Sequence, residues 1–238
     1  MILAFDTSTS VLSVALVRDR EIVAEYAETA HRNHSAALVP AIDRVLQEAG
    51  TEVAGLKAIA VGRGPGSYTG VRIAVTVAKT LAWSAGVKLI GVSSLRTIAA
   101  GAMAEEGDWI VPLIDARRGH AYTALFEKTP AGVRRHAPDK KRPVKEWAKE
   151  LAERADQEAR KLIFAGEIGS FQADLMPLID RSGGRVKQAE APMQARYAAF
   201  HALEQVETAP ASPEAVHAFV PDYTQPAEVE LKFMNKGS

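Results

Sequence analysis

The stretch Gly62-Arg63-Gly64-Pro65-Gly66-Ser67-Tyr68-Thr69-Gly70-Val71-Arg72-Ile73 joins an apolar segment to a long helical pattern through a glycine-rich loop. The preceding residues, 56–61, are mostly apolar, which predicts a buried strand. Behind the loop, apolar residues recur at helical spacing until Gly86, which supplies a stop signal. Such a loop directs free backbone amides and the positive end of the helix dipole at whatever lies above it. The expected ligand of the loop is therefore a phosphate or a carboxylate.

The spacing of the glycines does not fit two common nucleotide-binding loops. A P-loop ends in Gly-Lys-Ser/Thr, whereas Gly70 is followed by Val71. A dinucleotide fingerprint needs G-x-G-x-x-G and an acid after the next strand, but the strand predicted at 88–92 ends in Ser93-Ser94. The glycines are also explained if the loop has to pass close to a neighbouring element, and the sequence leaves both explanations open.

The composition narrows the class of protein. The 238 residues suffice for a sizeable core, and 29 Lys+Arg balance 29 Asp+Glu, so no net charge draws the chain to nucleic acid or to anionic lipid. Any RNA contact must be local or shared. The absence of cysteine excludes disulfides, thiol nucleophiles and thiolate metal sites. The apolar run at 2–5 is far short of a secretory signal, and no run approaches the roughly 20 residues of a membrane span. We therefore expect a cytoplasmic protein without a membrane partner.

The order of predicted elements indicates an internal duplication. Three short strands, at 2–5, 12–17 and 22–26, are followed by a helix at 35–49 and then by the strand, glycine loop and helix described above. The pattern restarts with a strand at 109–114 that ends in Asp115, as the first strand ends in Asp6. Strand triplets followed by alternating helices and strands predict a two-lobed α/β protein with mixed sheets covered by helices. We expect a first lobe at 1–105 and a second at 106–238, with the C-terminal segment as a candidate to return to the first lobe.

The second half carries less decisive signals. A strand at 121–126 is followed by a charged segment after Ala137-Pro138, and then by a helix at 144–160. Further predicted elements are a strand at 162–165, helices near 170–178 and around 197–203, and a strand at 185–188; the last helix is expected to turn Tyr197, Phe200 and Leu203 inward. The basic groups Arg117-Arg118, Arg134-Arg135 and Lys140-Lys141-Arg142 predict a solvated loop face, with contact to a tRNA backbone as the alternative.

Four motifs together make the chain resemble the bacterial tRNA threonylcarbamoyladenosine biosynthesis family TsaB, also called YeaZ. They are Ala4-Phe5-Asp6-Thr7-Ser8, the long glycine stretch, Gly91-Val92-Ser93-Ser94-Leu95 and Ile114-Asp115-Ala116-Arg117. The resemblance is dense up to about Tyr122 and thin beyond, apart from Pro221-Asp222-Tyr223. It implies the two-lobed fold of actin, sugar kinases and heat-shock ATPases.

The resemblance also implies a function and a set of partners. Members of the family help to attach a threonylcarbamoyl group to the adenosine next to the anticodon of tRNAs that read codons starting with A. They are similar to the catalytic subunit TsaD but act as its non-catalytic partner, together with the ATPase TsaE; TsaC makes the substrate. The resemblance further implies a homodimer when the chain is alone, and contact with tRNA only within the complex.

No metal site and no catalytic residue are expected. In TsaD the corresponding segment runs Gly-Val-Asn-His-x-x-x-His, whose two histidines hold a metal, whereas this chain has Ser94 and Ile98 at those positions. His31 and His34 have no nearby carboxylate in the sequence. The remaining histidines are predicted to be surface or packing residues: His120, His136, His201 and His217. A sugar-kinase-like phosphotransferase and a metallopeptidase remain as alternative functions.

The first turn and the glycine loop are the candidates for a phosphate contact. In proteins of this fold an Asp and hydroxyl groups after the first strand face the nucleotide phosphates and their Mg²⁺. The residues so assigned are Asp6, Thr7, Ser8, Gly64, Gly66 and Ser67. ATP or ADP is accordingly expected at or near a subunit interface, without tight binding. The alternative is a strand-end turn held by its own side-chain hydrogen bonds.

The helix predicted at 35–49 has a broader apolar arc than a helix with one face in water requires. We therefore predict that it forms, with the helix at 71–85, the surface used for self-association and for TsaD. The residues assigned to this surface are Leu38, Val39, Ile42, Val45, Leu46, Val71 and Val75. A helix well buried in its own lobe would show the same arc.

Overall fold

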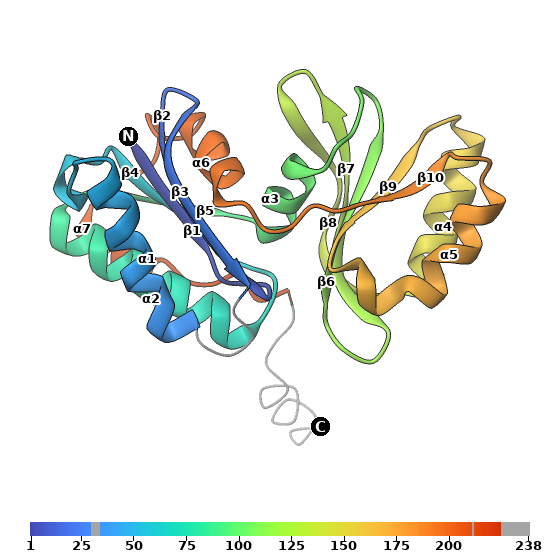
Figure 1. Ribbon diagram of the computed structural model, residues 1–238, viewed down its shortest axis with the longest axis horizontal. Helices are drawn as coiled ribbons and strands as arrows, with labels where there is room; N and C mark the ends of the chain where they lie inside the picture. Colours follow the sequence, from blue (N-terminus) through green and yellow to red (C-terminus); the bar gives the residue numbers. More distant parts are fainter. Residues whose placement is uncertain (30–33, 211, 225–238) are drawn as a thin grey trace.

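The computed structural model describes residues 1–29, 34–210 and 212–224, which form two mixed five-stranded sheets (Figure 1). The first sheet has the order β3-β2-β1-β4-β5 and the second the order β10-β9-β6-β7-β8. The first sheet consists of β1 Ile2–Asp6, β2 Val11–Arg18, β3 Glu21–Thr29, β4 Ala58–Gly62 and β5 Lys88–Val92. The second consists of β6 Trp109–Asp115, β7 His120–Thr129, β8 Gly132–Pro143, β9 Leu162–Gly166 and β10 Val186–Ala189.

The two sheets share one topology. In each, the first strand pairs antiparallel with the second and the second with the third, while the fourth and fifth strands continue parallel to the first. The predicted duplication and the two-lobed α/β fold with mixed sheets are therefore confirmed.

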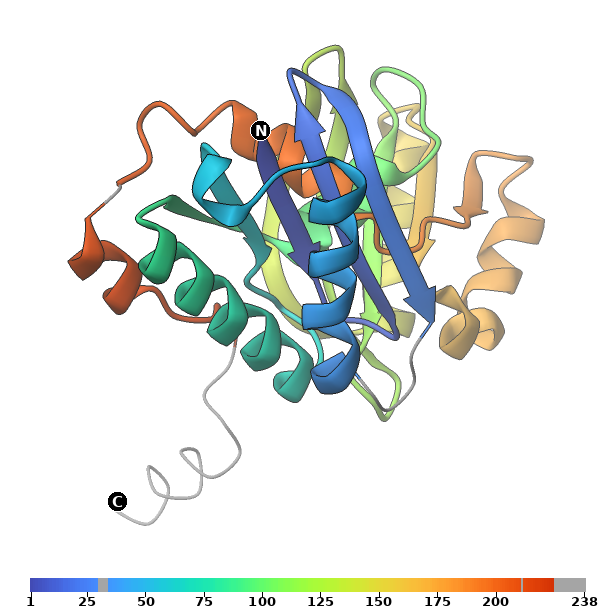
Figure 2. The same ribbon diagram turned by 60° about the vertical axis from the view of Figure 1, so that its left-hand side comes forward.

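Helices cover both sheets. Helices α1 (His34–Glu48) and α2 (Tyr68–Ala85) pack on the outer face of the first sheet, and α7 (Pro213–Ala218) lies against α2 (Figure 2). Helices α4 (Val144–Gln157) and α5 (Gln172–Arg181) cover the outer face of the second sheet. Between the sheets, α3 (Ser94–Gly101) packs on the second and α6 (Ala195–Leu203) on the first, and the two helices contact each other. Two 3-10 turns, Val53–Gly55 and Ile168–Phe171, complete the structure.

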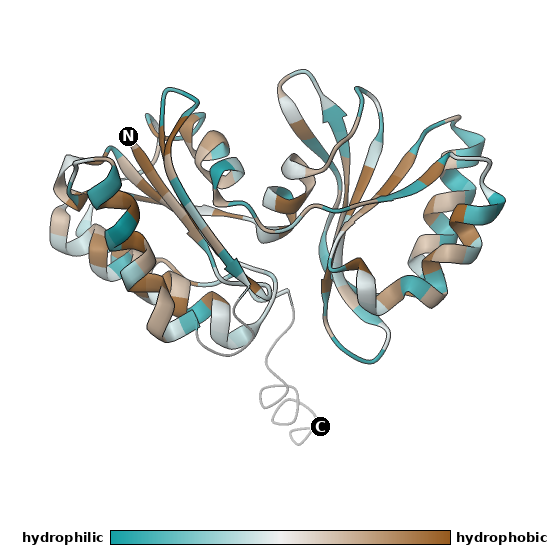
Figure 3. Ribbon diagram, in the orientation of Figure 1, coloured by the Kyte–Doolittle hydropathy of each residue, from teal (hydrophilic) through white to brown (hydrophobic). Residues whose placement is uncertain are grey.

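The strands are rich in apolar residues, coloured brown in Figure 3, and these residues form core clusters with the helices. One face of the first sheet forms a core with α1 and α2, and the other face packs on α6. The side chains of α6 that turn inward are the small ones, Ala195, Ala198, Ala199 and Ala202. Phe200 and Leu203 are half-buried and pack against the same core from its margin, so the prediction that they point inward is confirmed in part. Tyr197, also half-buried, lies against Gly101 of α3. A helix packed closely against two strands has room only for small side chains, which leaves the large ones at its margins.

The segment predicted as a charged loop is also different: residues 132–143 form the edge strand β8, which pairs antiparallel with β7. Arg134-Arg135 and Lys140-Lys141-Arg142 thus lie on a strand. Charged side chains are compatible with an edge strand because only one of its backbone sides is paired and its side chains stay hydrated. Helix α7, which was not predicted from the sequence, packs Val216 into the core of the first lobe. Within the described ranges, no helix combines the length and the apolar character that crossing a bilayer requires.

Candidate functional site

The glycine loop lies directly against the turn that follows β1. A Cβ added to Gly62 would overlap the carboxyl group of Asp6, and one added to Gly70 would overlap the carbonyl group of Thr7. At Gly66 the same test places an added Cβ 2.6 Å from Ser8 Cβ. The three glycines therefore permit a close approach between two backbone segments, so the packing explanation of the glycine loop accounts for them.

Hydrogen bonds fix this contact. The backbone amide of Ser8 donates to Asp6 Oδ1 and the hydroxyl of Ser94 donates to Asp6 Oδ2, each at 2.7 Å. The hydroxyl of Thr7 donates to the carbonyl oxygen of Gly70 at 2.7 Å, and the amide of Ser67 donates to the carbonyl oxygen of Ser8 at 2.7 Å. Partners inside the protein thus occupy the carboxylate of Asp6 and the hydroxyl of Thr7, whereas the hydroxyl of Ser8 is buried without a hydrogen-bond partner among the described residues.

The turn is withdrawn from solvent as a consequence. Asp6 and Thr7 are fully buried and Ser8 is 1% exposed. Burial raises the pKa of Asp6, while the hydrogen bonds from Ser8 and Ser94 oppose that rise. The glycine loop covers these three side chains, so the assignment of a phosphate contact to them stays a prediction that their burial does not favour.

The three loop residues assigned with them lie close by. Gly64 has a φ of +100° and lies under the C-terminal segment, since an added Cβ would come within 3.1 Å of the carbonyl oxygen of Asp222. Gly66 carries a φ of +159° and borders Ser8. Ser67 caps α2, its hydroxyl accepting from the amide of Gly70 at 3.3 Å.

A glutamate that the sequence analysis did not single out joins the two lobes near this turn. Glu167, which follows β9, accepts hydrogen bonds from the amide of Ser10 (3.2 Å) and from the amide of Asp115 (2.9 Å). The turns after β1 and β6, which correspond by duplication, therefore share one carboxylate. An acid at the end of a predicted strand was the signal that could have identified it.

The histidine positions contain no metal-ligand group. Ile98 is buried in a core cluster, as expected for that position. Ser94 donates a hydrogen bond to Asp6 and is not the cap of α3; the cap is Ser93, whose hydroxyl accepts from the amide of Arg96 at 3.1 Å. His34 Nε2 lies 3.0 Å from the carbonyl oxygen of Thr9, and His31 lies outside the described residues. Over the described part of the chain, no three His, Cys, Asp or Glu side chains are grouped so that they could hold a metal ion.

The predicted partner surface is displaced from the residues assigned to it. Leu38, Ile42, Val45 and Leu46 of α1 are buried in the core of their own lobe, and so are Val71 and Val75 of α2. For these six residues a direct contact with a partner is therefore wrong, and the broad apolar arc is explained by packing against the sheet and between α1 and α2. Val39 is different, because it is 55% exposed.

The outward face of α2 presents a separate set of residues. A groove of about 420 Å³ is lined by Tyr68, Thr69, Arg72, Ile73, Thr76 and Val77. Tyr68 stacks on Tyr223 with ring centroids 5.6 Å apart, and the guanidinium of Arg72 lies 5.2 Å from the Tyr68 ring centroid. Further along the helix, Trp83 is 67% exposed. A sequence pattern does not distinguish these side chains from core residues, because their exposure depends on where the helix meets its sheet.

Comparisons with known proteins agree with this architecture. The family model for TsaD, tRNA N6-adenosine threonylcarbamoyltransferase, matches residues 20–182. The tRNA threonylcarbamoyladenosine biosynthesis protein TsaB of Bacillus subtilis is 36% identical over 233 residues, which cover 98% of this chain and 97% of the relative. The chain belongs to the TsaB family. The TsaB protein of Escherichia coli is 41% identical over 133 residues, covering 56% of this chain and 57% of that relative.

Solved structures extend the likeness to the fold. A Pseudomonas aeruginosa protein described as similar to the peptidase YEAZ has a TM-score of 0.76 and 27% identity, covering 94% of this chain and 99% of its own. A structure of YeaZ from the same organism has a TM-score of 0.72 and 25% identity, covering 93% and 98% of the two chains. Membership of the TsaB family therefore includes the second lobe, where the sequence motifs are sparse.

Proposed function

We propose that this protein is the non-catalytic partner subunit of a TsaD-type threonylcarbamoyltransferase. The similarity to TsaB over 98% of the chain carries the proposal. The TsaD-type domain match is consistent with a subunit that shares the fold of its catalytic partner. In this proposal the protein supports the modification of tRNA and leaves the transfer itself to TsaD.

The contacts of Ser94 and Ile98, which occupy the positions of the two metal-binding histidines of TsaD, support a non-catalytic role. Ser94 donates to the buried Asp6, and Ile98 is packed among apolar side chains. Restoring a histidine at Ser94 would remove the hydrogen bond to Asp6 and place a larger ring in a fully buried position. These positions thus serve the stability of the lobe.

We place the partner surface on the outward faces of α1 and α2. The groove along α2 and the exposed Val39 and Trp83 lie on the side of the helices that does not touch the sheet. Aromatic and arginine side chains such as Tyr68 and Arg72 are favoured at the centres of protein interfaces. A shared face would make self-association and TsaD binding mutually exclusive, so a homodimer would dissociate before the heterodimer forms.

The remaining parts of the proposal follow from the family. TsaE would complete the assembly, ATP or ADP would bind at or near the subunit interface, and tRNA would be contacted only within the complex, in the cytoplasm. The turn at Asp6 is buried beneath the glycine loop, which is consistent with weak nucleotide binding by the isolated chain.

An interface variant tests the surface. Val39→Glu combined with Thr76→Glu places two charges on exposed positions of α1 and α2, where the fold does not need the original side chains. We expect loss of TsaD binding and of self-association in analytical ultracentrifugation, with an unchanged thermal unfolding curve. Met103→Glu is the matched control, because Met103 is 85% exposed on the segment after α3, away from both helices. If the double variant binds TsaD as well as Met103→Glu does, the surface is elsewhere.

A reconstituted assay tests the role. The purified chain with threonylcarbamoyl-adenylate and tRNA should give no product, whereas addition of TsaD and TsaE should restore modification. Turnover by the chain alone would refute the non-catalytic role. Tight ATP binding in calorimetry with phosphoryl transfer would favour a phosphotransferase. The peptidase likeness of a structural relative is tested by metal analysis and by peptide cleavage.

A further inference from the structure

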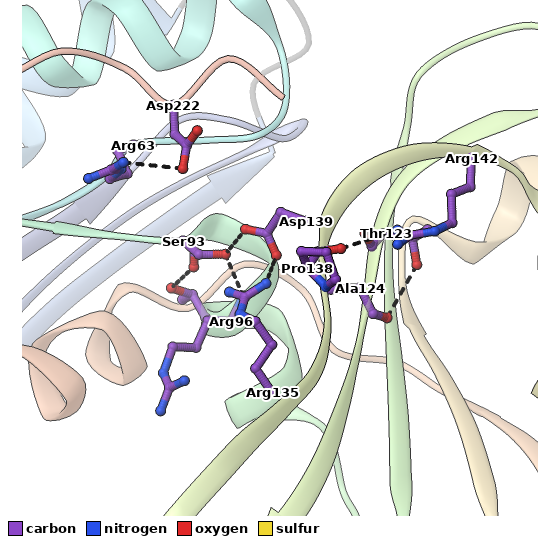
Figure 4. Close-up of polar contacts among 11 residues, drawn as sticks. Arg63, Ser93, Arg96, Thr123, Ala124, Arg135, Pro138, Asp139, Arg142 and Asp222 are labelled. Atoms are coloured by element: carbon purple, nitrogen blue, oxygen red, sulfur yellow. Dashed lines mark hydrogen bonds and ion pairs between the residues drawn. The ribbon is translucent and has the colours of Figure 1, made fainter. Parts of the chain in front are cut away.

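A cavity of about 430 Å³ opens between the two lobes, apart from the turn at Asp6 (Figure 4). Its wall combines side chains from the end of β4, the start of α3, the edge strand β8 and helix α6. The polar residues that matter here are Arg63, Ser93, Arg96, Arg135, Asp139 and His201. We call Arg96 and Arg135, together with the neighbouring His201, the inter-lobe basic cluster.

The charges around this cavity are incompletely matched. Arg63 pairs with Asp222 at 3.2 Å, and Arg135 pairs with Asp139, whose carboxylate also accepts a hydrogen bond from the hydroxyl of Ser93 at 2.6 Å. Arg96 has no ion pair and no side-chain hydrogen bond within 1–29, 34–210 and 212–224. Figure 4 shows Arg135 turned to Asp139, while Arg96 extends in a different direction.

The guanidinium groups of Arg96 and Arg135 repel each other, and Arg96 also disfavours the charged form of His201. Burial lowers the pKa of Arg96, and burial followed by the positive charge of Arg96 lowers the pKa of Arg135. Burial and then the charge of Arg96 also lower the pKa of His201. Glu204, whose carboxylate raises the pKa of both Arg96 and His201, is shared with Arg20 at 3.0 Å and His201 at 3.3 Å. A half-buried guanidinium among other cations is unfavourable unless an anion joins it.

We infer that this cavity binds a phosphate-type anion, with Arg96 as the main contact and Arg135 and Arg63 as further sources of positive charge. The planar guanidinium group matches the oxygens of a phosphate with two parallel hydrogen bonds. The volume is sufficient for a small anion with its first hydration shell, or for the phosphate groups of a nucleotide. The site is independent of the proposed function, because it uses neither the outward faces of α1 and α2 nor the Asp6 turn.

Calorimetric titration of the full chain with inorganic pyrophosphate tests the inference. We expect saturable binding with one site per chain. Arg96→Gln should weaken it by about tenfold or more, and Arg96→Lys should retain a large part of the affinity. Arg44→Gln is the matched control, because Arg44 is an exposed arginine of α1 paired with Glu48. Titrations with ATP and with adenosine distinguish the sources of the phosphate: a nucleotide site binds ATP, competes with pyrophosphate and does not bind adenosine.

A second variant changes the affinity in the opposite direction. Asp139→Asn removes the carboxylate that competes with the anion for Arg135, and its amide can still accept from Ser93. It should strengthen pyrophosphate binding by a few fold, an effect that unfolding cannot produce. The inference is overturned if pyrophosphate does not saturate the protein, if Arg96→Gln and Arg44→Gln weaken it equally, or if Asp139→Asn leaves the affinity unchanged. Should Arg96→Gln fail to fold, the Asp139→Asn titration decides.

Discussion

Replacement of Gly62 by alanine should destabilise the protein strongly, although it adds a single methyl group. Gly62 ends β4 beneath the carboxyl group of Asp6, and the added Cβ would lie 2.9 Å from Asp6 Cβ and overlap the carboxyl group itself. Backbone lies on both sides of this contact, because Asp6 belongs to β1, the strand paired with β4. The Asp6 side chain must therefore turn away.

The cost can be estimated from what the displaced carboxyl group loses. It forfeits the 2.7 Å hydrogen bond from Ser94, which leaves buried polar groups unpaired at about 1–3 kcal/mol. Overpacking of a close contact adds about 1–3 kcal/mol. The total of about 2–6 kcal/mol is a large fraction of the roughly 5–15 kcal/mol by which a domain is stable.

Urea unfolding followed by circular dichroism measures the effect as a lower midpoint with an unchanged slope. Gly169→Ala is the control, because an alanine there meets nothing within 4 Å and Gly169 does not have a positive φ, so its stability should change by less than about 1 kcal/mol. In an Asp6→Ala background, Gly62→Ala should cost less, since the overlapping carboxyl group is gone and only the 2.9 Å contact with the Cβ of residue 6 remains. The packing explanation of the glycine loop is refuted if Gly62→Ala unfolds within about 1 kcal/mol of the parent protein.

Three further changes test other parts of the structure. Hydrogen bonds from Arg134 and then His136 lower the pKa of Glu127 from its ordinary value near 4.5 to about 2. The contribution of Glu127 to the free energy of unfolding is therefore complete above pH 4.5 and is lost as the pH falls towards about 2. Glu127→Gln should remove this pH dependence of the free energy of unfolding. The upper limit of the change is about 3 kcal/mol, and solvent screening reduces it because Arg134 is largely exposed. An unaltered pH dependence would contradict this assignment. Leu38→Ala should cost about 2–5 kcal/mol because Leu38 is fully buried, whereas Val39→Ala should change stability by about 0.5 kcal/mol or less; equal effects in thermal unfolding would count against the assignment of Leu38 to the core. Ser67→Ala removes the cap of α2 and should cost about 0.5–2 kcal/mol in urea unfolding, while Ser67→Asn should recover most of the loss.

The local patterns of the chain were sufficient to predict most of its elements. Alternation and apolar runs located nine of the ten strands, and Gly86, with a left-handed φ of +65°, ends α2 where the sequence placed the stop. The exception was β8, because an edge strand with hydrated charges lacks the apolar alternation on which strand prediction depends. The repeated order of strands also made the duplication visible, since each lobe encodes its topology in consecutive segments.

Only the tertiary structure decided what each surface faces. The sequence showed that α1 has a broad apolar arc, but such an arc is compatible with a subunit interface and with burial in the lobe's own core. In the structure the arc packs against the first sheet and α2, and its residues belong to the core. Likewise, an Asp6 that follows a strand is compatible with a phosphate site as far as the sequence shows. In the structure its carboxyl group is enclosed by Gly62 and Ser94, which lie 56 and 88 positions away along the chain. The grouping of Arg96 with Arg135 arises because α3 packs against β8 of the second sheet. Periodicity and capping are properties of neighbours along the chain, whereas burial, pairing of charges and free surface depend on neighbours in space.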